Sequence, residues 1–322
     1  MNGARLRSRF ALLIATLALL VAACGGESDA PPSDTSWSAQ AIAPAQDSAG
    51  IPLFVNSSRL GVGANRIAFG FFDREGALLS EVTADVRLFT LDGDEGTFVS
   101  ERALTRVALE LGAVHEHDDG TLHDHSGATV ALFVANVGFT RSGDWGAEVT
   151  IDLDGDRVAT RLRFVVQERT PEPMIGDAIP RSVQRVLADV DAVEEIDSSL
   201  PPVPEMHDQT VAAALDAGRP MLVAFATSAF CQSRFCGPVI DGIVRPLLDR
   251  YGSEAAFIHI EPFDLAEARD AGRLVGLPVM AEWGLTTEPW VFIVDGDGRV
   301  SAKFEGIMSL AEVEAALAAV LE

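Results

Sequence analysis

The stretch PMLVAFATSAFCQSRFCGP, residues 220–238, decides the fold. It opens with an apolar run, residues 221–226, whose length and composition are typical of a buried strand. A loop of small and polar residues follows and carries Cys231 and Cys236, and a periodic apolar segment then runs to residue 251. The pattern predicts a strand, a cysteine loop and the start of a helix. A cysteine at a helix N-terminus lies at the positive end of the helix dipole, which favours thiolate over thiol.

This layout resembles the thioredoxin superfamily, and the sequence further on resembles it too. The segment EWGLTTEPW, residues 282–290, is similar to the segment that carries the family's cis-proline, here Pro289. The apolar strand and the turn at residues 291–298 are similar to the family's C-terminal hairpin. The resemblance covers residues 205–322 and implies a thioredoxin-like α/β domain.

The spacing of the cysteines departs from the family, because four residues separate them where two are usual. Cys236-Gly237-Pro238-Val239 resembles the family's active tetrapeptide with valine in place of its last cysteine. The resemblance therefore implies thiol-disulfide exchange on extracytoplasmic client proteins, a reaction that needs no cofactor. In it Cys236 attacks, Cys231 resolves, Arg234 stabilises the thiolate, and Pro289 presents the backbone edge that docks an extended client.

Two other functions for the cysteine pair remain open at this point. One is a disulfide that only staples a non-catalytic interaction module. The other is copper handling like that of the Sco proteins, with Cys231, Cys236 and His259 as the alternative copper ligands, although the Sco histidine lies later in the chain. In this alternative the histidine-rich loop at residues 115–125 supplies or senses the ion. His259 stands in an apolar strand and either packs in the core or points toward the cysteine loop. His207 is expected to be exposed near a helix start.

A second candidate site is the histidine-rich loop HEHDDGTLHDH, residues 115–125. His115, His117, His123 and His125 form two His-x-His pairs around an Asp-Gly turn. Imidazoles placed in this way can converge on one ion, which suits copper or zinc. The alternative is a solvated polar loop within a hairpin.

The N-terminus predicts the cellular location. Arginines precede an apolar run at residues 10–23 that is too short to span a bilayer. The run ends in VAAC, which resembles a bacterial lipobox with Cys24 as the lipidated residue; a plain secretory signal is the alternative. We therefore expect a signal peptide at 1–23, a flexible tether at 24–50, and a protein that a lipid anchors to the extracytoplasmic face of the membrane. Disulfides persist in that environment, and the two remaining cysteines make an even pair.

The rest of the chain completes a two-domain prediction. Residues 51–169 show period-two alternation with short Asp-Gly turns, and they resemble the immunoglobulin-like sandwiches of extracytoplasmic bacterial proteins. Residues 170–204 are rich in proline and are predicted to be a linker. The predicted fold class is thus an all-β immunoglobulin-like sandwich followed by an α/β thioredoxin-like domain. The formal net charge of -24 argues against binding to nucleic acid.

Overall fold

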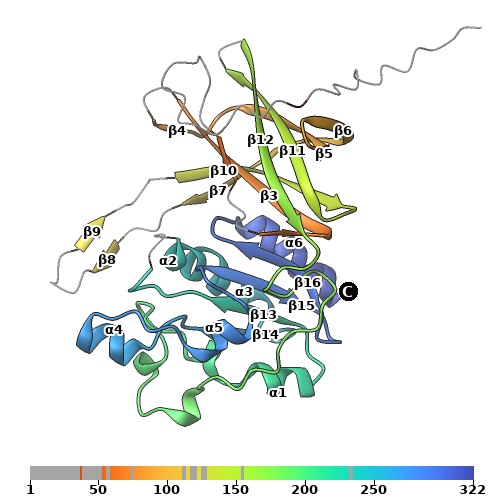
Figure 1. Cartoon of the computed structure of the whole chain (residues 1–322). Helices are drawn as coiled ribbons and strands as arrows, with labels where there is room; N and C mark the ends of the chain where they lie inside the picture. The colour runs from red at the N-terminus through yellow and green to blue at the C-terminus, as the bar shows by residue number, and fades with distance from the viewer. Residues whose placement is uncertain are drawn as a thin grey trace, which may run out of the picture. The chain divides into compact units, whose positions relative to one another are not determined.

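The computed structural model describes residues 37, 53–55, 59–73, 76–110, 114–116, 122–124, 129–153, 156–231 and 235–322. Contacts along the chain divide it into two units, Met1–Ser33 and Asp34–Glu322, and every described residue belongs to the second. The described part contains sixteen strands and six α-helices (Figure 1). The predicted signal peptide and Cys24 lie outside the described residues.

Two five-stranded sheets make up the part of the chain before residue 170. The first has the order β1-β3-β10-β7, with β4 paired to β3, and the second has the order β2-β12-β11-β5-β6. The strands of the first sheet are β1 (Leu53–Val55), β3 (Gly63–Phe72), β4 (Leu78–Leu79), β7 (Thr105–Glu110) and β10 (Thr129–Phe139). Those of the second are β2 (Leu60–Gly61), β5 (Thr83–Asp92), β6 (Glu95–Ala103), β11 (Gly143–Leu153) and β12 (Asp156–Gln167). The short hairpin of β8 (Val114–Glu116) and β9 (Leu122–Asp124) follows β7.

The two sheets share an apolar core because alternate residues of their strands face it. Ile67, Phe69 and Phe71 of β3 are buried there, two positions apart. Aromatic rings join the two sheets: Phe139 of β10 lies 4.8 Å from Trp145 of β11 between ring centroids. Contacts of this kind stabilise the pair of sheets through burial of large apolar surfaces.

A third sheet of four strands has the order β14-β13-β15-β16. Its strands are β13 (Met221–Phe225), β14 (Ala256–Ile260), β15 (Trp290–Val294) and β16 (Val300–Glu305). The central strand β13 runs parallel to β14 and antiparallel to β15. All five residues of β13 are buried, which requires cover on both faces of the sheet.

Helices supply that cover (Figure 1). The α-helices are α1 (Val211–Asp216), α2 (Cys236–Val239), α3 (Arg245–Tyr251), α4 (Leu265–Ala271), α5 (Pro278–Glu282) and α6 (Leu310–Leu321), with a π-helical segment η4 (Ile240–Val244) between α2 and α3. Leu222 and Ala224 of β13 share a core with α2, α3 and α6, whereas Met221, Val223 and Phe225 share one with α1 and α5. The π-helical segment ends at Val244, two positions before Pro246, which lies in the first turn of α3.

The predicted fold class, an immunoglobulin-like domain followed by a thioredoxin-like α/β domain, is wrong. The described chain contains more strand than helix and forms no clear α/β thioredoxin-like domain, although its first half is rich in β-strands as expected. The physical reason lies in β10, where all residues from Ala131 to Ala135 are buried. Phe133 enters the core between the two five-stranded sheets, and Leu132 and Val134 enter the core that contains α2, α3 and α6.

The proline-rich stretch 170–204 does more than connect these parts. It carries three short 3-10 turns, η1 (Leu187–Asp189), η2 (Val193–Glu195) and, at its end, η3 (Pro204–His207). Glu172 is 2% exposed and accepts a hydrogen bond from Lys303 of β16 at 3.1 Å. A Cβ on Gly284 would lie 2.4 Å from the Pro171 carbonyl oxygen, so the backbones of the two segments are in close contact. The stretch is therefore packed along the four-stranded sheet and its helices.

Trp37 is fully buried although it lies in the predicted tether. Its ring packs against Phe89 with 4.7 Å between centroids, and the Arg161 guanidinium lies 5.0 Å from its centre. A Cβ on Gly146 would come within 2.4 Å of this ring, so β11 has room for the tryptophan only because the residue there is glycine. Trp37 thus fixes one point of the N-terminal segment to the second sheet.

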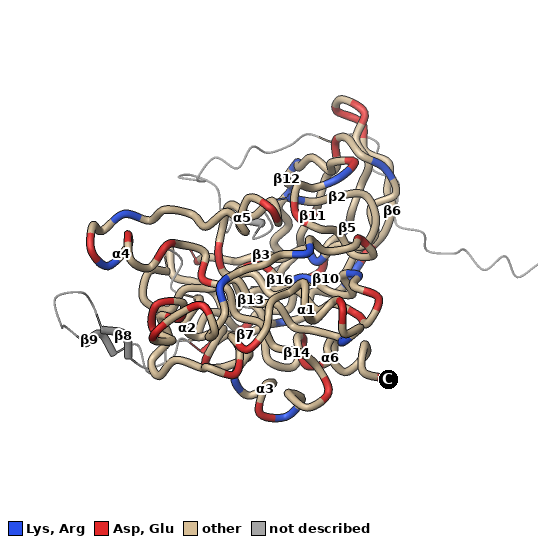
Figure 2. Tube along the Cα trace, turned by 90° about the horizontal axis from the view of Figure 1, so that it is seen from below, with Lys and Arg blue, Asp and Glu red and all other residues tan. Residues whose placement is uncertain are grey.

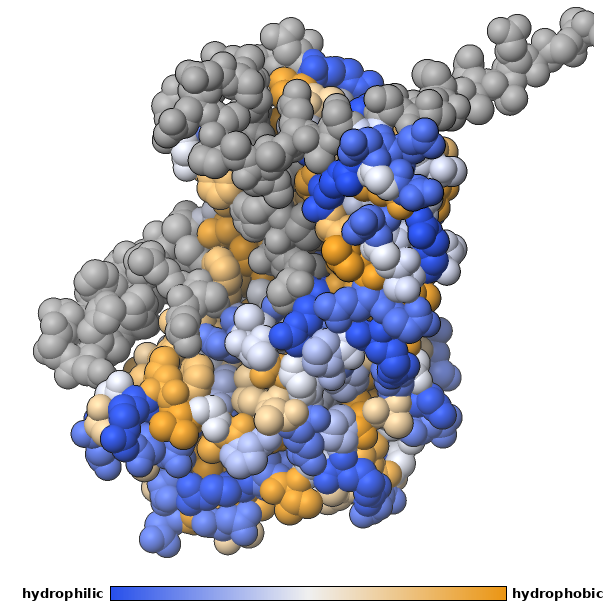
Figure 3. All heavy atoms as spheres, in the orientation of Figure 1, coloured by the Kyte–Doolittle hydropathy of each residue, from blue (hydrophilic) through white to orange (hydrophobic). Residues whose placement is uncertain are grey.

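The surface carries the acidic excess that the composition predicts. Asp and Glu positions are spread over loops and helix ends and are not gathered in one patch (Figure 2). The face drawn in Figure 3 is mainly hydrophilic, with hydrophobic residues in separate areas. Within the part of the chain that the structure describes, no helix has the length and apolar character needed to cross a membrane.

Candidate functional site

Cys231 and Cys236 form a disulfide at the start of the helix that begins with α2. Their Cα atoms are 5.9 Å apart, and five positions separate them in the sequence. Strand β13 ends at Phe225, and the disulfide holds Cys231 beside the first turn of the helix. The predicted strand, cysteine loop and helix start are therefore present.

The two sulfur-bearing residues differ in exposure. Cys236 is 0% exposed and packs in the core with Val239 and Ile240, whereas Cys231 is partly exposed. The backbone N–H of Cys236 donates a hydrogen bond to Cys231 Sγ at 3.2 Å. The accessible residue of the pair is thus Cys231, although the sequence prediction assigned the attack to Cys236.

A carboxylate lies beside the disulfide. An oxygen of Glu288 and the two cysteine sulfurs all lie within 4.8 Å of one another. The next residue, Pro289, follows a cis peptide bond, so the segment predicted to carry a cis-proline is next to the cysteines. Arg234, predicted to stabilise the thiolate, lies outside the described residues.

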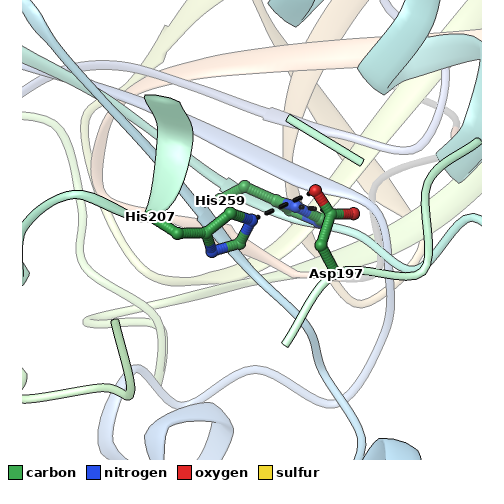
Figure 4. A group of neighbouring side chains, drawn as sticks. All are labelled: Asp197, His207 and His259. Atoms are coloured by element: carbon green, nitrogen blue, oxygen red, sulfur yellow. Dashed lines mark hydrogen bonds and ion pairs between the residues drawn. The ribbon is translucent and has the colours of Figure 1, made fainter. Parts of the chain in front are cut away.

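A second cluster of polar side chains is buried near the same end of β13 and β14. Asp197 comes from the stretch 170–204, His207 from η3 and His259 from β14, and the three side chains point toward one another (Figure 4). Each of the three residues is at most 2% exposed. Their ligand atoms all lie within 4.8 Å of one another, so the group can hold a metal ion.

Asp197 is the centre of this cluster. Its carboxylate accepts hydrogen bonds from the backbone N–H of Ser199 at 2.8 Å and of Val203 at 2.9 Å. One oxygen also lies 3.2 Å from Nε2 of His207, and the other lies 3.6 Å from Nδ1 of His259. The carboxylate is therefore held in place from several sides.

The protonation of the two histidines differs for physical reasons. Burial lowers the pKa of His259, but the Asp197 carboxylate outweighs it and raises the pKa to about 9. Burial also lowers the pKa of His207, and the opposing effect of the Asp197 carboxylate is too small to restore it, so the pKa of His207 stays below its ordinary value. Burial raises the pKa of Asp197, yet its hydrogen bonds to the two histidines and the charge of His259 hold that pKa well below its usual range. At neutral pH, Asp197 is therefore ionised, His259 is protonated and His207 is neutral.

Hydrogen bonds connect this cluster to the cysteine loop. Ser198 Oγ accepts the backbone N–H of Ala229 at 3.1 Å and lies 3.3 Å from the Thr227 hydroxyl. The backbone N–H of Ser198 donates to Glu261 at 2.7 Å, and burial raises the pKa of that glutamate. The loop before Cys231 is thus held by the residues that flank Asp197.

His207 and His259 line a cleft with a volume of about 1020 Å³. Its wall is largely apolar and includes Val183, Phe263 and Leu277, and Glu261 also lines it. The two buried histidines therefore lie at the wall of this cleft.

The histidines predicted as ligands are only partly brought together. His115 and His123 are directly opposite each other in the β8–β9 hairpin, which confirms the predicted hairpin, while His117 and His125 lie outside the described residues. The alternative copper site required His259 to lie beside the two cysteines. His259 instead groups with Asp197 and His207.

His207 is buried, so its predicted exposure is wrong. Asp197 and Glu261 are not identified by sequence reasoning. The one available signal is the pairing of a histidine and a glutamate within and just after an apolar strand, at positions 259 and 261.

The protonated His259 predicts a pH dependence of stability. Its folded pKa of about 9 lies above its ordinary value of 6.5, so its contribution is complete below pH 6.5 and is lost as the pH rises through 9. The shift corresponds to about 3 kcal/mol of unfolding free energy. Urea unfolding in metal-free buffer from pH 6 to pH 9.5 measures it, and His259→Gln is the control because it removes this titration. Equal slopes for the two proteins would contradict the prediction.

The chain was compared with known families, curated proteins and solved structures. No family model and no curated protein matches it. Among solved structures, the chain is similar to the soluble domain of PmoD from Methylocystis sp. ATCC 49242 (Rockwell), at 13% identity and a TM-score of 0.21 over 36% of this chain and 90% of that one. It is also similar to the alkylpurine DNA glycosylase AlkC of Pseudomonas fluorescens, bound to DNA with an abasic site analog, at 12% identity and a TM-score of 0.20 over 36% of this chain. The match spans 29% of the AlkC chain, and both scores are too low to carry an argument about fold or function.

Proposed function

We propose that this protein exchanges disulfides with extracytoplasmic client proteins through Cys231 and Cys236. The observation that carries the proposal is the asymmetry of the pair, since Cys231 is partly exposed and Cys236 is fully buried. A structural disulfide has no need for one accessible sulfur, whereas an exchange reaction requires that a client thiol reach one of the two.

The reaction balances as a two-electron exchange. A client thiolate attacks Cys231 Sγ, the bond between the two cysteines breaks, and Cys236 leaves as a thiolate. A second client thiolate then attacks the client sulfur of the mixed disulfide, which releases Cys231 as a thiolate and leaves the client oxidised. In the reverse direction Cys231 attacks a client disulfide and Cys236 resolves the intermediate.

Local structure supports both thiolates. The helix from Cys236 through α2, η4 and α3 begins at the cysteine, so Cys236 lies where the first unpaired N–H groups favour negative charge. The N–H of Cys236 already points at Cys231 Sγ at 3.2 Å and would stabilise a thiolate there. Glu288 is close enough to both sulfurs to take up or return the thiol proton.

Client recognition would use the surface next to the pair. Ser228 belongs to the loop that leads to Cys231, and its Oγ lies 3.4 Å from Ser199 Oγ. Leu200, which follows Ser199, is 71% exposed. Since Ser199 contacts the loop before Cys231, an exposed leucine there suits an unfolded client with exposed apolar side chains. Pro289 would add a backbone edge for an extended segment.

Reduction of insulin disulfides by dithiothreitol tests the proposal. The protein at catalytic concentration should accelerate insulin precipitation, and the Cys231→Ser/Cys236→Ser double variant should not. No acceleration at any ratio of protein to insulin would contradict exchange on protein clients.

A second candidate function is metal binding by the reduced pair. Two thiolates and the Glu288 carboxylate within 4.8 Å form a donor set that suits Cu(I) or Zn²⁺. This reading places copper on the cysteines only after the disulfide is reduced. Metal stoichiometry of the reduced protein against the double cysteine variant separates it from exchange, because exchange needs no metal.

We also infer that the protein is lipid-anchored on the extracytoplasmic side, with Cys24 as the acylated residue. The basis is the VAAC boundary in the sequence together with a cysteine pair suited to an oxidising compartment. This location would present Cys231 to secreted clients.

A further inference from the structure

In the cluster of Asp197, His207 and His259, two hydrogen-bond acceptors would face each other if His259 carried neither a second proton nor a metal ion. Nε2 of His259 lies 2.9 Å from the Ala226 carbonyl oxygen and therefore donates its hydrogen to it. In a neutral imidazole the other nitrogen, Nδ1, then carries only a lone pair. This atom has no hydrogen-bond partner within the described part of the chain, and it faces Asp197 Oδ1 at 3.6 Å. A lone pair and a carboxylate oxygen repel in a buried site, so a positive charge must lie between them.

We propose that this positive charge is a divalent transition-metal ion such as Zn²⁺, held by His207 Nε2, His259 Nδ1 and an Asp197 carboxylate oxygen. Zn²⁺ bonds of about 2.0–2.1 Å place neighbouring ligand atoms about 3.3 Å apart in a tetrahedral site. Here His207 Nε2 lies 3.2 Å from Asp197 Oδ2 and His259 Nδ1 lies 3.6 Å from Asp197 Oδ1, and one ligand atom from each of the three residues lies within 4.8 Å of the other two. The ligand atoms must therefore move closer together around one carboxylate oxygen to form the site.

The surrounding residues hold the ligands in orientations suited to a metal. The Ala226 carbonyl fixes His259 with Nδ1 toward Asp197. The backbone N–H groups of Ser199 and Val203 hold the Asp197 carboxylate from the other side. Metal-binding histidines ordinarily donate their second ring N–H in this manner, and ligating carboxylates are themselves hydrogen-bonded.

The charges around the site favour a doubly charged ion. Glu261 is the second buried carboxyl group that interacts with His259, and one of its oxygens has no hydrogen-bond partner in the described chain. A single proton on His259 balances one carboxylate, whereas a divalent ion balances two. Two imidazoles and a carboxylate also make up a donor set that suits zinc and its neighbours in the first transition series.

The cleft provides the route to the site. Both histidines line this cavity of about 1020 Å³, whose wall is mainly apolar. Three protein ligands leave a coordination position for water or for a small molecule that enters the cleft. The proposed ion is therefore accessible, and it differs from any ion held by Cys231 and Cys236 or by the histidine loop.

Zinc titration of the full chain tests the proposal. The starting protein carries alanine at His115, His117, His123 and His125 and keeps its disulfide oxidised, so the other two donor sets are removed. Calorimetry with Zn²⁺ should show one equivalent bound per chain. His207→Ala in this background should weaken binding by about 100-fold or more, because one of three ligands is lost.

A second measurement needs no substitution in the cluster and so does not depend on how His207→Ala folds. The ¹⁵N shift of His259 Nδ1 should move to the range of a metal-bound imidazole nitrogen when one equivalent of Zn²⁺ is added. The proposal is overturned if no saturable zinc binding occurs, or if Nδ1 keeps the shift of a protonated nitrogen throughout. In either case the charge between His259 and Asp197 is a proton. Activity in disulfide exchange has no part in this test.

Discussion

Cys231→Ser should abolish insulin reduction and should form no mixed disulfide with a client. Cys231 is the partly exposed residue of the pair, so its loss removes the sulfur that a client can reach. Cys236→Ser should also stop turnover, but it should accumulate a stable mixed disulfide, because Cys231 still attacks and nothing resolves the product. Both single variants should lose turnover by at least about 100-fold, as expected when a nucleophile is removed.

The distribution of mixed disulfides decides between the two cysteines. Mass spectrometry after incubation with a disulfide-containing client, and trapping with acid, should find the adduct on Cys231 in the Cys236→Ser protein. The double variant is the control for non-specific capture. An adduct that forms in Cys231→Ser and not in Cys236→Ser would restore the assignment of the attack to Cys236.

Asp197→Ala should destabilise the protein by about 3–5 kcal/mol, the range for breaking a buried ion pair by removal of one partner. The variant leaves His259 buried without its carboxylate and deprives the N–H groups of Ser199 and Val203 of their acceptor. Unsatisfied donors of this kind each add to the loss. The midpoint of urea unfolding at pH 7 measures the effect.

Asp177→Ala is a matched control from the same stretch of chain. Asp177 also accepts a backbone hydrogen bond, from Met174 at 2.9 Å, but its ion-pair partner Arg169 is largely exposed. A pair of that kind contributes at most about 1 kcal/mol. If Asp197→Ala and Asp177→Ala lower the free energy of unfolding by similar amounts, the buried cluster contributes no more to stability than an exposed ion pair, which would contradict the prediction.

Local features of the fold follow well from the sequence. The pattern of residues 220–238 predicts the strand, the cysteine loop and the helix start, because each depends on a few neighbouring residues. The capping box of Ser309 and Glu312 is present at the start of α6, as its spacing predicts. At the start of α1 the Thr210 hydroxyl accepts a hydrogen bond from the backbone N–H of Ala213.

Features that depend on distant contacts do not follow. Residues 131–135 are apolar at every position, which is typical of a strand buried on both faces, but the sequence does not say what covers each face. This uncertainty is why the predicted fold class is wrong. The histidine cluster could not be predicted from the sequence for the same reason. Asp197 belongs to a proline-rich stretch far from His259 in the sequence, and the two side chains lie close together only in the folded chain, where β14 pairs with β13.

The relative burial of the two cysteines is also a tertiary property. Helix position alone favours Cys236 as the reactive thiol, because the dipole and the free N–H groups lie there. The fold instead buries Cys236 in the core with Val239 and Ile240 and leaves Cys231 at the surface. In the proposed exchange, access therefore makes Cys231 the sulfur that a client attacks, and the field at the helix start would stabilise Cys236 as the leaving thiolate.

The reduction potential of the Cys231–Cys236 pair tests the proposed exchange most directly. Equilibration of the full chain with glutathione buffers, followed by alkylation of free thiols and mass spectrometry, gives the value. A working dithiol should have a potential more oxidising than about -300 mV, within the range of known exchange proteins. A potential well below about -300 mV would mark a structural bond and would contradict the proposed function.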